Sequence, residues 1–224
     1  MYDAVLVDFY GTLVDEDFEQ IAAISGRVAA AAPAQPSPTE VRRRWSELFS
    51  ARCAEAHGKH FRPQRELEVA SLAALLAEFR APLDPVDLSQ PLFAYWSAPR
   101  PRPGAVEFLR ELRRPLCLVS NIDRADLQAA LDVRGWSFER IVTSEDCRAY
   151  KPRPEMFIRA LESLGCAPGA ALHVGDSVGS DLAGAAASGI AAAWVNPTGR
   201  ALPSGLARGP RHVVRDLREL IDLV

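Results

Sequence analysis

Short runs of apolar residues recur along the chain, and each has the length of a single buried strand. The first run is 4–7, which ends directly before Asp8. Uninterrupted apolar runs of this length are typical of strands that are covered on both faces, as in a parallel sheet. The other runs lie at 116–119, 140–143, 171–174 and 191–195.

Stretches in which apolar residues have helical spacing separate these strands. They lie at 105–112, 125–131, 154–164 and 181–187. A chain that alternates strands with helices builds a parallel sheet, because each helix carries the chain back to the start of the next strand. The pattern therefore predicts an α/β fold with a Rossmann-like parallel sheet core.

Residues 17–94 have a different pattern, with helical spacing of apolar positions and no strand-like run. Val41 and Trp45, for example, fall four residues apart on one helix face. A cluster of prolines separates the first helical stretch from the second, because proline ends a helix. The sequence thus predicts a core formed by 1–16 and 95–224, with an inserted all-helical cap domain at 17–94.

Composition and charge exclude several kinds of partner. The formal net charge is −3, which gives no basic surface for nucleic acid. No apolar run approaches the ~20 residues that span a membrane, and no basic leader precedes the first strand. The four cysteines are scattered, which is typical of reduced thiols. We therefore expect a cytoplasmic protein that acts on a small-molecule substrate.

Polar side chains follow three of the predicted strands, at the point where each strand ends. Asp8 follows the first strand, Ser120 and Asn121 follow the second, and Asp176 follows the run at 171–174. In open α/β sheets ligands bind outside the carboxyl ends of the strands. The sequence therefore predicts one site at this edge of the sheet.

The segment Asp8-Phe9-Tyr10-Gly11-Thr12-Leu13 contains a candidate nucleophile. A carboxylate at a strand end can attack an electrophile when cations and amides neutralise its charge, and a glycine permits the tight turn that exposes it. The alternative is a structural aspartate before a glycine turn. Ser120 and Asn121 can donate hydrogen bonds to an anionic oxygen, although Ser-Asn is also a common turn pair.

Two further segments carry charge. Lys151, in Tyr150-Lys151-Pro152, is one of two lysines in the chain and could hold two carboxylates together. Gly175-Asp176-Ser177 is followed by Asp181, and paired carboxylates beside Asp8 would form an oxygen-rich site suited to Mg²⁺. The alternative for Asp176 or Asp181 is helix capping.

In order and spacing, these four segments resemble the four signature motifs of the haloacid dehalogenase-like hydrolases. The resemblance implies that Asp8 is the nucleophile and also a ligand of Mg²⁺, with Asp176, Asp181 and the backbone carbonyl of Tyr10. It implies that Thr12 and Lys151 act at the catalytic centre. It also implies that Ser120 and Asn121 bind the transferring group, and that the helical insertion is the family's cap.

Tyr10 departs from the phosphatase pattern, in which a second aspartate two residues after the nucleophile serves as the general acid and base. A phenol with an ordinary pKa near 10 is a poor base at neutral pH, and losing a general acid typically costs ~10²–10⁴-fold. Tyr10 instead matches the Asp-x-Tyr-Gly-Thr motif of 2-haloacid dehalogenases, which need no metal. Asp176 and Asp181 match the magnesium-dependent phosphatases.

The sequence therefore favours a magnesium-dependent phosphohydrolase that forms an aspartyl-phosphate and acts on a substrate with a good leaving group. The first alternative is a metal-independent 2-haloacid dehalogenase, and the second is a binding module that has lost catalysis. A cap residue such as His57, His60 or Glu66 could supply the missing proton, and Lys59 could form a Schiff base. His173, inside the strand at 171–174, is interpreted as a core residue.

Overall fold

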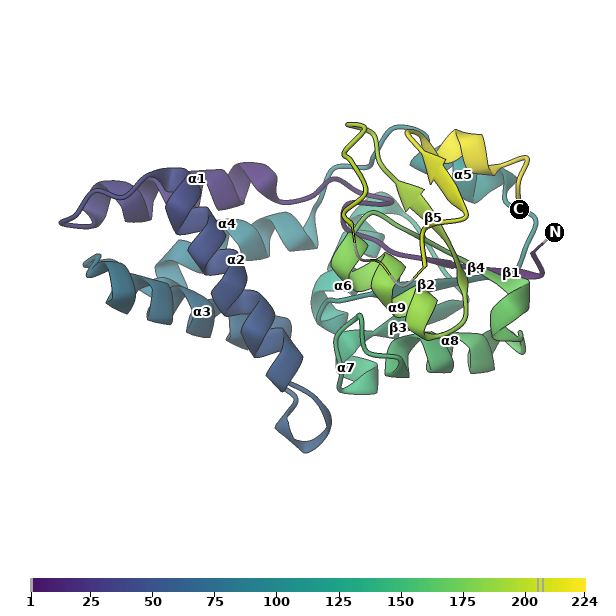
Figure 1. Cartoon of the computed structure of the whole chain (residues 1–224), viewed down its shortest axis with the longest axis horizontal. Helices are drawn as coiled ribbons and strands as arrows, with labels where there is room; N and C mark the ends of the chain where they lie inside the picture. Colours follow the sequence, from purple (N-terminus) through teal and green to yellow (C-terminus); the bar gives the residue numbers. More distant parts are fainter. Residues whose placement is uncertain (1, 205, 207) are drawn as a thin grey trace. The chain divides into compact units, whose positions relative to one another are not determined.

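The computed structural model describes residues 2–204, 206 and 208–224. The chain folds into two compact units, each of which is described by itself (Figure 1). The α/β unit comprises the residues up to Glu16 together with Arg100–Asn121 and Ser137–Val224. The helical unit comprises Asp17–Pro99 and Ile122–Trp136.

Six strands of the described chain form one parallel sheet in the order β3-β2-β1-β4-β5-β6. The strands are β1 (Ala4–Val7), β2 (Leu116–Ser120), β3 (Arg140–Thr143), β4 (Ala171–Gly175), β5 (Ala191–Val195) and β6 (His212–Val214). The α/β class and the parallel sheet predicted from the sequence are confirmed. The strand β6 was not predicted, because three residues at a sheet edge leave too short an apolar pattern to recognise.

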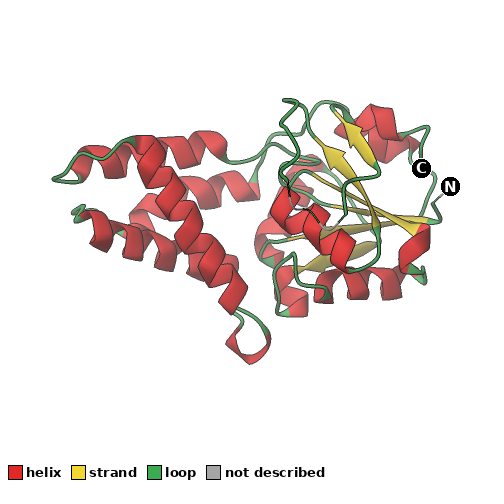
Figure 2. Cartoon of the chain, in the orientation of Figure 1, coloured by secondary structure: helices red, strands yellow, loops and turns green. Residues whose placement is uncertain are grey.

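Helices lie on both sides of this sheet, and α5 and α8 lie on opposite sides of it (Figure 2). On one face of the sheet, Leu6, Cys117 and Trp194 pack with Phe157 of α8 in a buried apolar cluster. This core fixes the central strands side by side, so that their carboxyl ends meet at one edge. The helical elements of the unit are α5 (Ala105–Glu111), α7 (Ser144–Cys147), α8 (Glu155–Leu164), α9 (Ala183–Ala187), η2 (Pro168–Ala170) and η4 (Leu217–Leu220).

The helix predicted at 181–187 begins earlier than expected, with a π-helical turn, η3 (Val178–Leu182), before α9. The Ser177 side chain caps this turn by accepting a hydrogen bond from the Ser180 N–H at 3.2 Å. Widened turns of this kind are often found at functional sites, since they re-aim a side chain relative to a regular helix. Here the turn carries Asp181.

The helical unit contains α1 (Phe18–Ala31), α2 (Pro38–Glu55), η1 (Gly58–His60), α3 (Gln64–Phe79), α4 (Pro85–Ser97) and α6 (Arg124–Arg134). Ser37 and Asp84 cap α2 and α4 through their side chains, and a proline occupies the next position in both helices. Both pairs are strong helix-start signals, because the cap satisfies a free N–H and proline needs none. Within the described residues, no helix is both long and apolar enough to cross a membrane.

The α6 segment packs with the helical unit, although it follows β2 in the chain. Asp123 accepts hydrogen bonds from the backbone N–H groups of Gln64 and Arg65, at 2.7 and 3.0 Å, and so caps the start of α3 from another segment. The Arg65 guanidinium also forms an ion pair with the buried Asp126. The assignment of 17–94 as the cap domain remains a prediction.

Buried acidic groups lie inside the helical unit. Glu68 of α3 is 5% exposed, and its carboxylate lies 3.4 Å from the Ser71 hydroxyl. Burial, together with the charge of Asp17, raises the pKa of Glu68 from its ordinary value of 4.5 to about 8. Asp17 itself accepts a hydrogen bond from the Trp96 indole at 2.8 Å.

The raised pKa of Glu68 makes the stability of the protein depend on pH. Between pH 4.5 and 8 the folded chain retains a proton that the unfolded chain releases, so stability falls as pH rises through this window. Glu68→Gln should therefore be more stable than the wild type at pH 8 by a few kcal/mol, on the order of 3. The two proteins should have similar stability at pH 5.

Urea unfolding followed by circular dichroism at pH 5, 6, 7 and 8 measures this difference. Glu55→Gln is the matched control, because Glu55 is exposed near the end of α2 and its substitution should give a difference that is flat with pH. The difference in unfolding free energy between the wild type and Glu68→Gln could also be independent of pH. That result would show that the buried carboxyl does not titrate in this way.

Candidate active site

Asp8 lies directly after β1 at the carboxyl edge of the sheet. Its N–H donates to the Val174 carbonyl at 2.9 Å, so β1 and β4 are still side by side where the carboxylate leaves the strand. The next residues form a tight turn in which the Phe9 carbonyl accepts from the N–H groups of Leu13 and Val14. Thr12 lies within this turn, and its hydroxyl donates to Asp8 Oδ2 at 3.2 Å.

Gly11 is required in this turn for two reasons. Its φ is +81°, a conformation that residues with a Cβ rarely adopt. A Cβ at this position would also overlap the Asp176 carboxylate. The glycine therefore permits both the turn after the nucleophile candidate and the close approach of a second acid.

Lys151 joins the carboxylates of two different motifs. Its ammonium donates to Asp8 Oδ1 at 2.7 Å, to Asp181 Oδ1 at 2.7 Å and to the Val119 carbonyl at 3.0 Å. These three bonds use all three ammonium protons. Burial by itself would lower the pKa of Lys151, but Asp181 and Asp8 outweigh it and raise that pKa above its ordinary value.

Three carboxylates meet at this point. Ligand oxygens of Asp8, Asp176 and Asp181 all lie within 4.8 Å of one another, and all three side chains are buried. Asp181 lies in the turn that follows β4, and a Cβ at Gly175 would overlap it. Burial would raise the pKa of Asp181, but Lys151 and His173 outweigh it and hold that pKa below its ordinary value.

Of the three carboxylates, Asp176 is the one whose negative charge is least compensated by nearby donors and cations. Its Oδ1 is buried and has no hydrogen-bond partner among the residues that the structure describes. Its Oδ2 forms a long ion pair with the half-exposed Arg200, at 3.8 Å. Burial, then Asp181 and Asp8, raise the pKa of Asp176 to about 7. Burial also raises the pKa of Asp8, against the opposing charge of Lys151.

The donor set fits a divalent cation. Three buried carboxylates face a single buried ammonium, and an unpaired buried charge is strongly unfavourable. Oxygen ligands are those that Mg²⁺ prefers, and the unpartnered Asp176 Oδ1 offers a ligand atom that no described residue uses. The chemistry and the charge of the residues present are therefore compatible with Mg²⁺.

The remaining predicted site residues lie in the same unit. Ser120 is buried at the end of β2. The Asn121 side chain accepts from the Lys151 N–H at 2.7 Å and donates to the Lys151 carbonyl at 3.3 Å, so it holds the lysine segment in place. Tyr10 is half-buried, with its ring edge-on to Phe9. The assignment of substrate-binding roles to Ser120 and Asn121 stays a prediction.

His173 contributes to the site, which the sequence analysis did not foresee. The core position predicted for it is correct, since it is 0% exposed in β4. Its Nε2 lies 2.9 Å from Asp181 Oδ1, so the imidazole also contacts one of the clustered carboxylates. The available signal was a polar residue inside a strand that is otherwise apolar, three positions before Asp176.

The candidate proton donors of 17–94 lie in the helical unit, as does the Arg42-Arg43-Arg44 run, in which an arginine could bind an anionic substrate group. Glu66 forms an exposed ion pair with Arg62, and Arg44 forms exposed ion pairs with Glu47 and Glu78. Exposed pairs of this kind are typical of a solvated helix face. Their role in catalysis stays a prediction.

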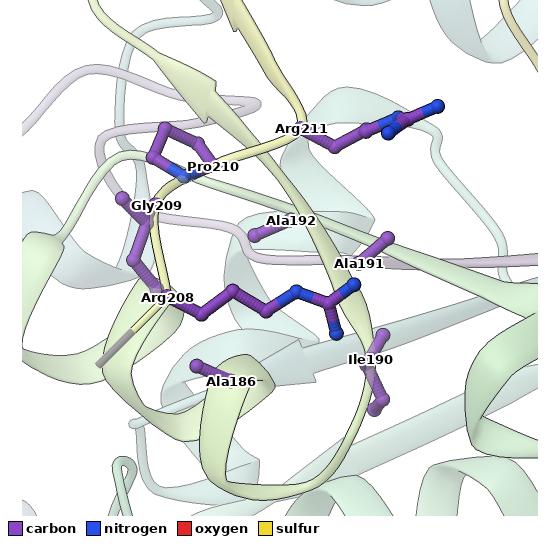
Figure 3. A pocket seen from close by; sticks show the side chains of 9 residues that line it. Ala186, Ile190, Ala191, Ala192, Arg208, Gly209, Pro210 and Arg211 are labelled. Atoms are coloured by element: carbon purple, nitrogen blue, oxygen red, sulfur yellow. The ribbon is translucent and has the colours of Figure 1, made fainter. Parts of the chain in front are cut away.

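A separate cavity of about 210 Å³ lies beside α9 and the segment before β6 (Figure 3). Its walls are formed by apolar residues such as Ala186 and Ile190, and by Arg208, whose side chain reaches across toward Ala191. Among the described residues that line it there is no carboxylate. This cavity is therefore distinct from the carboxylate cluster.

A family model described as "haloacid dehalogenase-like hydrolase" matches residues 2–189. Among curated proteins, the chain is 34% identical over 129 residues to pyrimidine 5'-nucleotidase YjjG of Escherichia coli, which covers 55% of the chain and 56% of the relative. It is 36% identical over 124 residues to phosphoserine phosphatase of Thermus thermophilus, which covers 53% and 49%. The chain thus spans about half the length of the curated relatives it matches.

Among solved structures, the L-2-haloacid dehalogenase RSc1362 aligns with a TM-score of 0.81. The alignment covers 100% of this chain and 98% of that chain, at 24% sequence identity. At this level of identity the likeness shows the fold alone.

The ion pairs of Lys151 with Asp8 and Asp181 can be tested in the absence of metal. Lys151→Met would leave Asp8 and Asp181 without their buried cation, so the variant should lose about 3–5 kcal/mol of unfolding free energy in EDTA. Adding Asp8→Asn should restore part of this loss, because one of the two uncompensated charges disappears. Urea unfolding of the single and double variants measures both effects.

Lys59→Met is the matched control, since Lys59 is the second lysine of the chain and is exposed in η1. Its substitution should change the free energy by no more than about 0.5 kcal/mol. A Lys151→Met variant as stable as the Lys59→Met variant would contradict the described role of the ammonium.

Proposed function

The chain belongs to the haloacid dehalogenase-like hydrolases, and from this premise we propose that it is a magnesium-dependent phosphohydrolase. In this proposal it acts on a small-molecule phosphate and forms an aspartyl-phosphate at Asp8. The observation that carries the proposal is the excess of buried negative charge around Asp176, whose Oδ1 has no partner among the described residues. A dehalogenase that uses no metal has no evident use for this carboxylate.

We propose that Asp8, Asp176, Asp181 and the backbone carbonyl of Tyr10 hold the Mg²⁺. When bound, Mg²⁺ supplies Lewis-acid stabilisation of negative charge on the transferring phosphoryl group. It would also favour the ionised form of Asp176, whose pKa is otherwise raised to about 7. The metal and the carboxylates are therefore mutually stabilising in this proposal.

The chain's own residues then divide the reaction into two steps. One Asp8 oxygen attacks phosphorus, and the bond from phosphorus to the leaving oxygen breaks. Water next attacks the phosphorus of the aspartyl-phosphate, which releases phosphate and regenerates the carboxylate. Lys151 holds Asp8 Oδ1 and Thr12 bonds Oδ2, so both fix the orientation of the nucleophile.

Tyr10 restricts the substrates that such an enzyme can cleave well. It occupies the position from which a second aspartate protonates the leaving oxygen in phosphatases of this family. Without that acid the leaving group must depart as an anion, which favours acyl phosphates or stabilised alkoxides. The similarity to a pyrimidine 5'-nucleotidase and to a phosphoserine phosphatase supports phosphate ester chemistry in general.

The second candidate function is 2-haloacid dehalogenation, and the observation that favours it is Tyr10 in an Asp-x-Tyr-Gly-Thr motif. Halide leaves without a proton, so this reaction needs no second acid. The third candidate is a binding module without catalysis. It has less support, because the Lys151 network and the carboxylate cluster are intact.

Two wider assignments complete the proposal. The helical residues 17–94 would serve as the cap that selects the substrate. The cellular location would be the cytoplasm, which fits four cysteines that are all free thiols.

Paired assays on p-nitrophenyl phosphate and L-2-chloropropionate, each with Mg²⁺ or with excess EDTA, separate the candidates. We expect phosphate release that requires Mg²⁺, because p-nitrophenolate leaves without an acid and so does not depend on the residue at position 10. Chloride release that is indifferent to EDTA would instead establish the dehalogenase. Absence of both reactions together with absence of Mg²⁺ binding would favour the binding module.

The variant Asp8→Asn tests the nucleophile directly. Phosphate release should fall by at least about 10³-fold, because the amide cannot form the covalent intermediate, while the circular dichroism spectrum stays unchanged. Asp3→Asn, at an exposed position before β1, is the matched control and should retain full activity. Retained turnover in Asp8→Asn would refute the assignment of the nucleophile.

A further inference from the structure

His173 is a polar residue on an apolar face of the sheet. Its strand neighbours are Leu6 on β1 and Ala192 on β5, and both belong to the buried apolar cluster on this face. The Phe157 ring packs edge-on against the imidazole, with the ring centroids 5.1 Å apart. A polar ring in such surroundings costs free energy unless it makes a hydrogen bond, so its presence calls for a specific partner.

That partner is Asp181. Nε2 lies 2.9 Å from Asp181 Oδ1, and Nδ1 is buried with no partner among the described residues. An ionised carboxylate only accepts hydrogen bonds, so Nε2 is the nitrogen that donates. The imidazole of His173 thus makes its one hydrogen bond in the described structure to the Asp181 carboxylate.

The Asp181 carboxylate is held by donors from three separate segments. Its Oδ1 accepts from both His173 and Lys151, and its Oδ2 accepts from the Ser177 N–H at 3.0 Å. Lys151 is shared with Asp8 and therefore does not constrain Asp181 alone. His173 and the Ser177 N–H are the donors in this set that serve only Asp181. Of these two, His173 is the one that a substitution can remove.

We propose that His173 is a positioning residue, which orients the Asp181 carboxylate for Mg²⁺ through its Nε2–H while Phe157 holds the imidazole in place. The inference rests on the proposed magnesium site and assigns a role to a residue outside the four motifs. Groups that hydrogen-bond metal-ligating carboxylates typically contribute 10–100-fold to metal affinity. We therefore expect the effect of His173 to appear in Mg²⁺ affinity before it appears in the chemical step.

The test is Mg²⁺ binding by isothermal titration calorimetry to the metal-free full chain, without substrate. His173→Leu removes the donor and keeps an apolar side chain, and it should weaken Mg²⁺ binding by about 10–100-fold. His173→Gln keeps an N–H donor near the position of Nε2 and should recover much of this affinity. In assays with p-nitrophenyl phosphate, the Mg²⁺ concentration for half-maximal activity should rise in His173→Leu, while kcat at saturating Mg²⁺ changes little.

Leu161→Ala is the control for a general loss of packing, because Leu161 lies in the same apolar cluster. It should lower the melting temperature without changing the Mg²⁺ dissociation constant. Unchanged Mg²⁺ affinity in a folded His173→Leu variant, or an equal loss of affinity in Leu161→Ala, would overturn the positioning role while leaving the magnesium site in place. Failure of the wild type to bind Mg²⁺ would overturn the proposed function, and this inference with it.

Discussion

The buried ammonium of Lys151 is the interaction on which the site depends. It lies 2.7 Å from a carboxylate oxygen of Asp8 and 2.7 Å from one of Asp181, and these acids come from opposite halves of the chain. Two buried carboxylates so close together would repel each other strongly without a shared cation. Several other features of the α/β unit bring these three side chains together. The parallel sheet brings β1 and β4 side by side, Asn121 fixes the lysine backbone, and Gly175 leaves space for Asp181.

The parts of this arrangement that depend on chain order could be predicted from the sequence. Apolar runs that end in Asp8, Ser120 and Asp176 must place those residues at one sheet edge if the strands are parallel. The parts that depend on three-dimensional packing could not. No pattern in the sequence indicates that the Asn121 amide bonds the backbone of Lys151, thirty residues away, or that Asp123 caps a helix that begins at Gln64. The strand β6 was missed for another reason, its length of three residues.

Tyr10 and Asp176 point to different branches of the family, and their energetic consequences are unequal. A missing general acid raises one barrier by ~3–5 kcal/mol, and a substrate whose leaving group is already stable removes that cost. A buried carboxylate with few partners lowers the stability of the folded protein whatever the substrate is. Asp176 Oδ1 has no partner among the described residues, and the half-exposed Arg200 lies 3.8 Å from Oδ2. A departure that substrate choice can compensate is weaker evidence about mechanism than a buried carboxylate whose pKa is raised and whose Oδ1 has no partner among the described residues. For this reason we rank the magnesium-dependent phosphohydrolase reaction above dehalogenation.

Directly after Asn121 the chain also crosses from the α/β unit into the helical unit. Asn121 bonds Lys151 in the α/β unit, whereas Asp123, two residues later, caps α3 in the helical unit. The helical unit of the structure therefore contains the segment that follows the second motif as well as the residues that follow the first. The residue that fixes the Lys151 backbone is thus separated by a single residue from the one that caps α3.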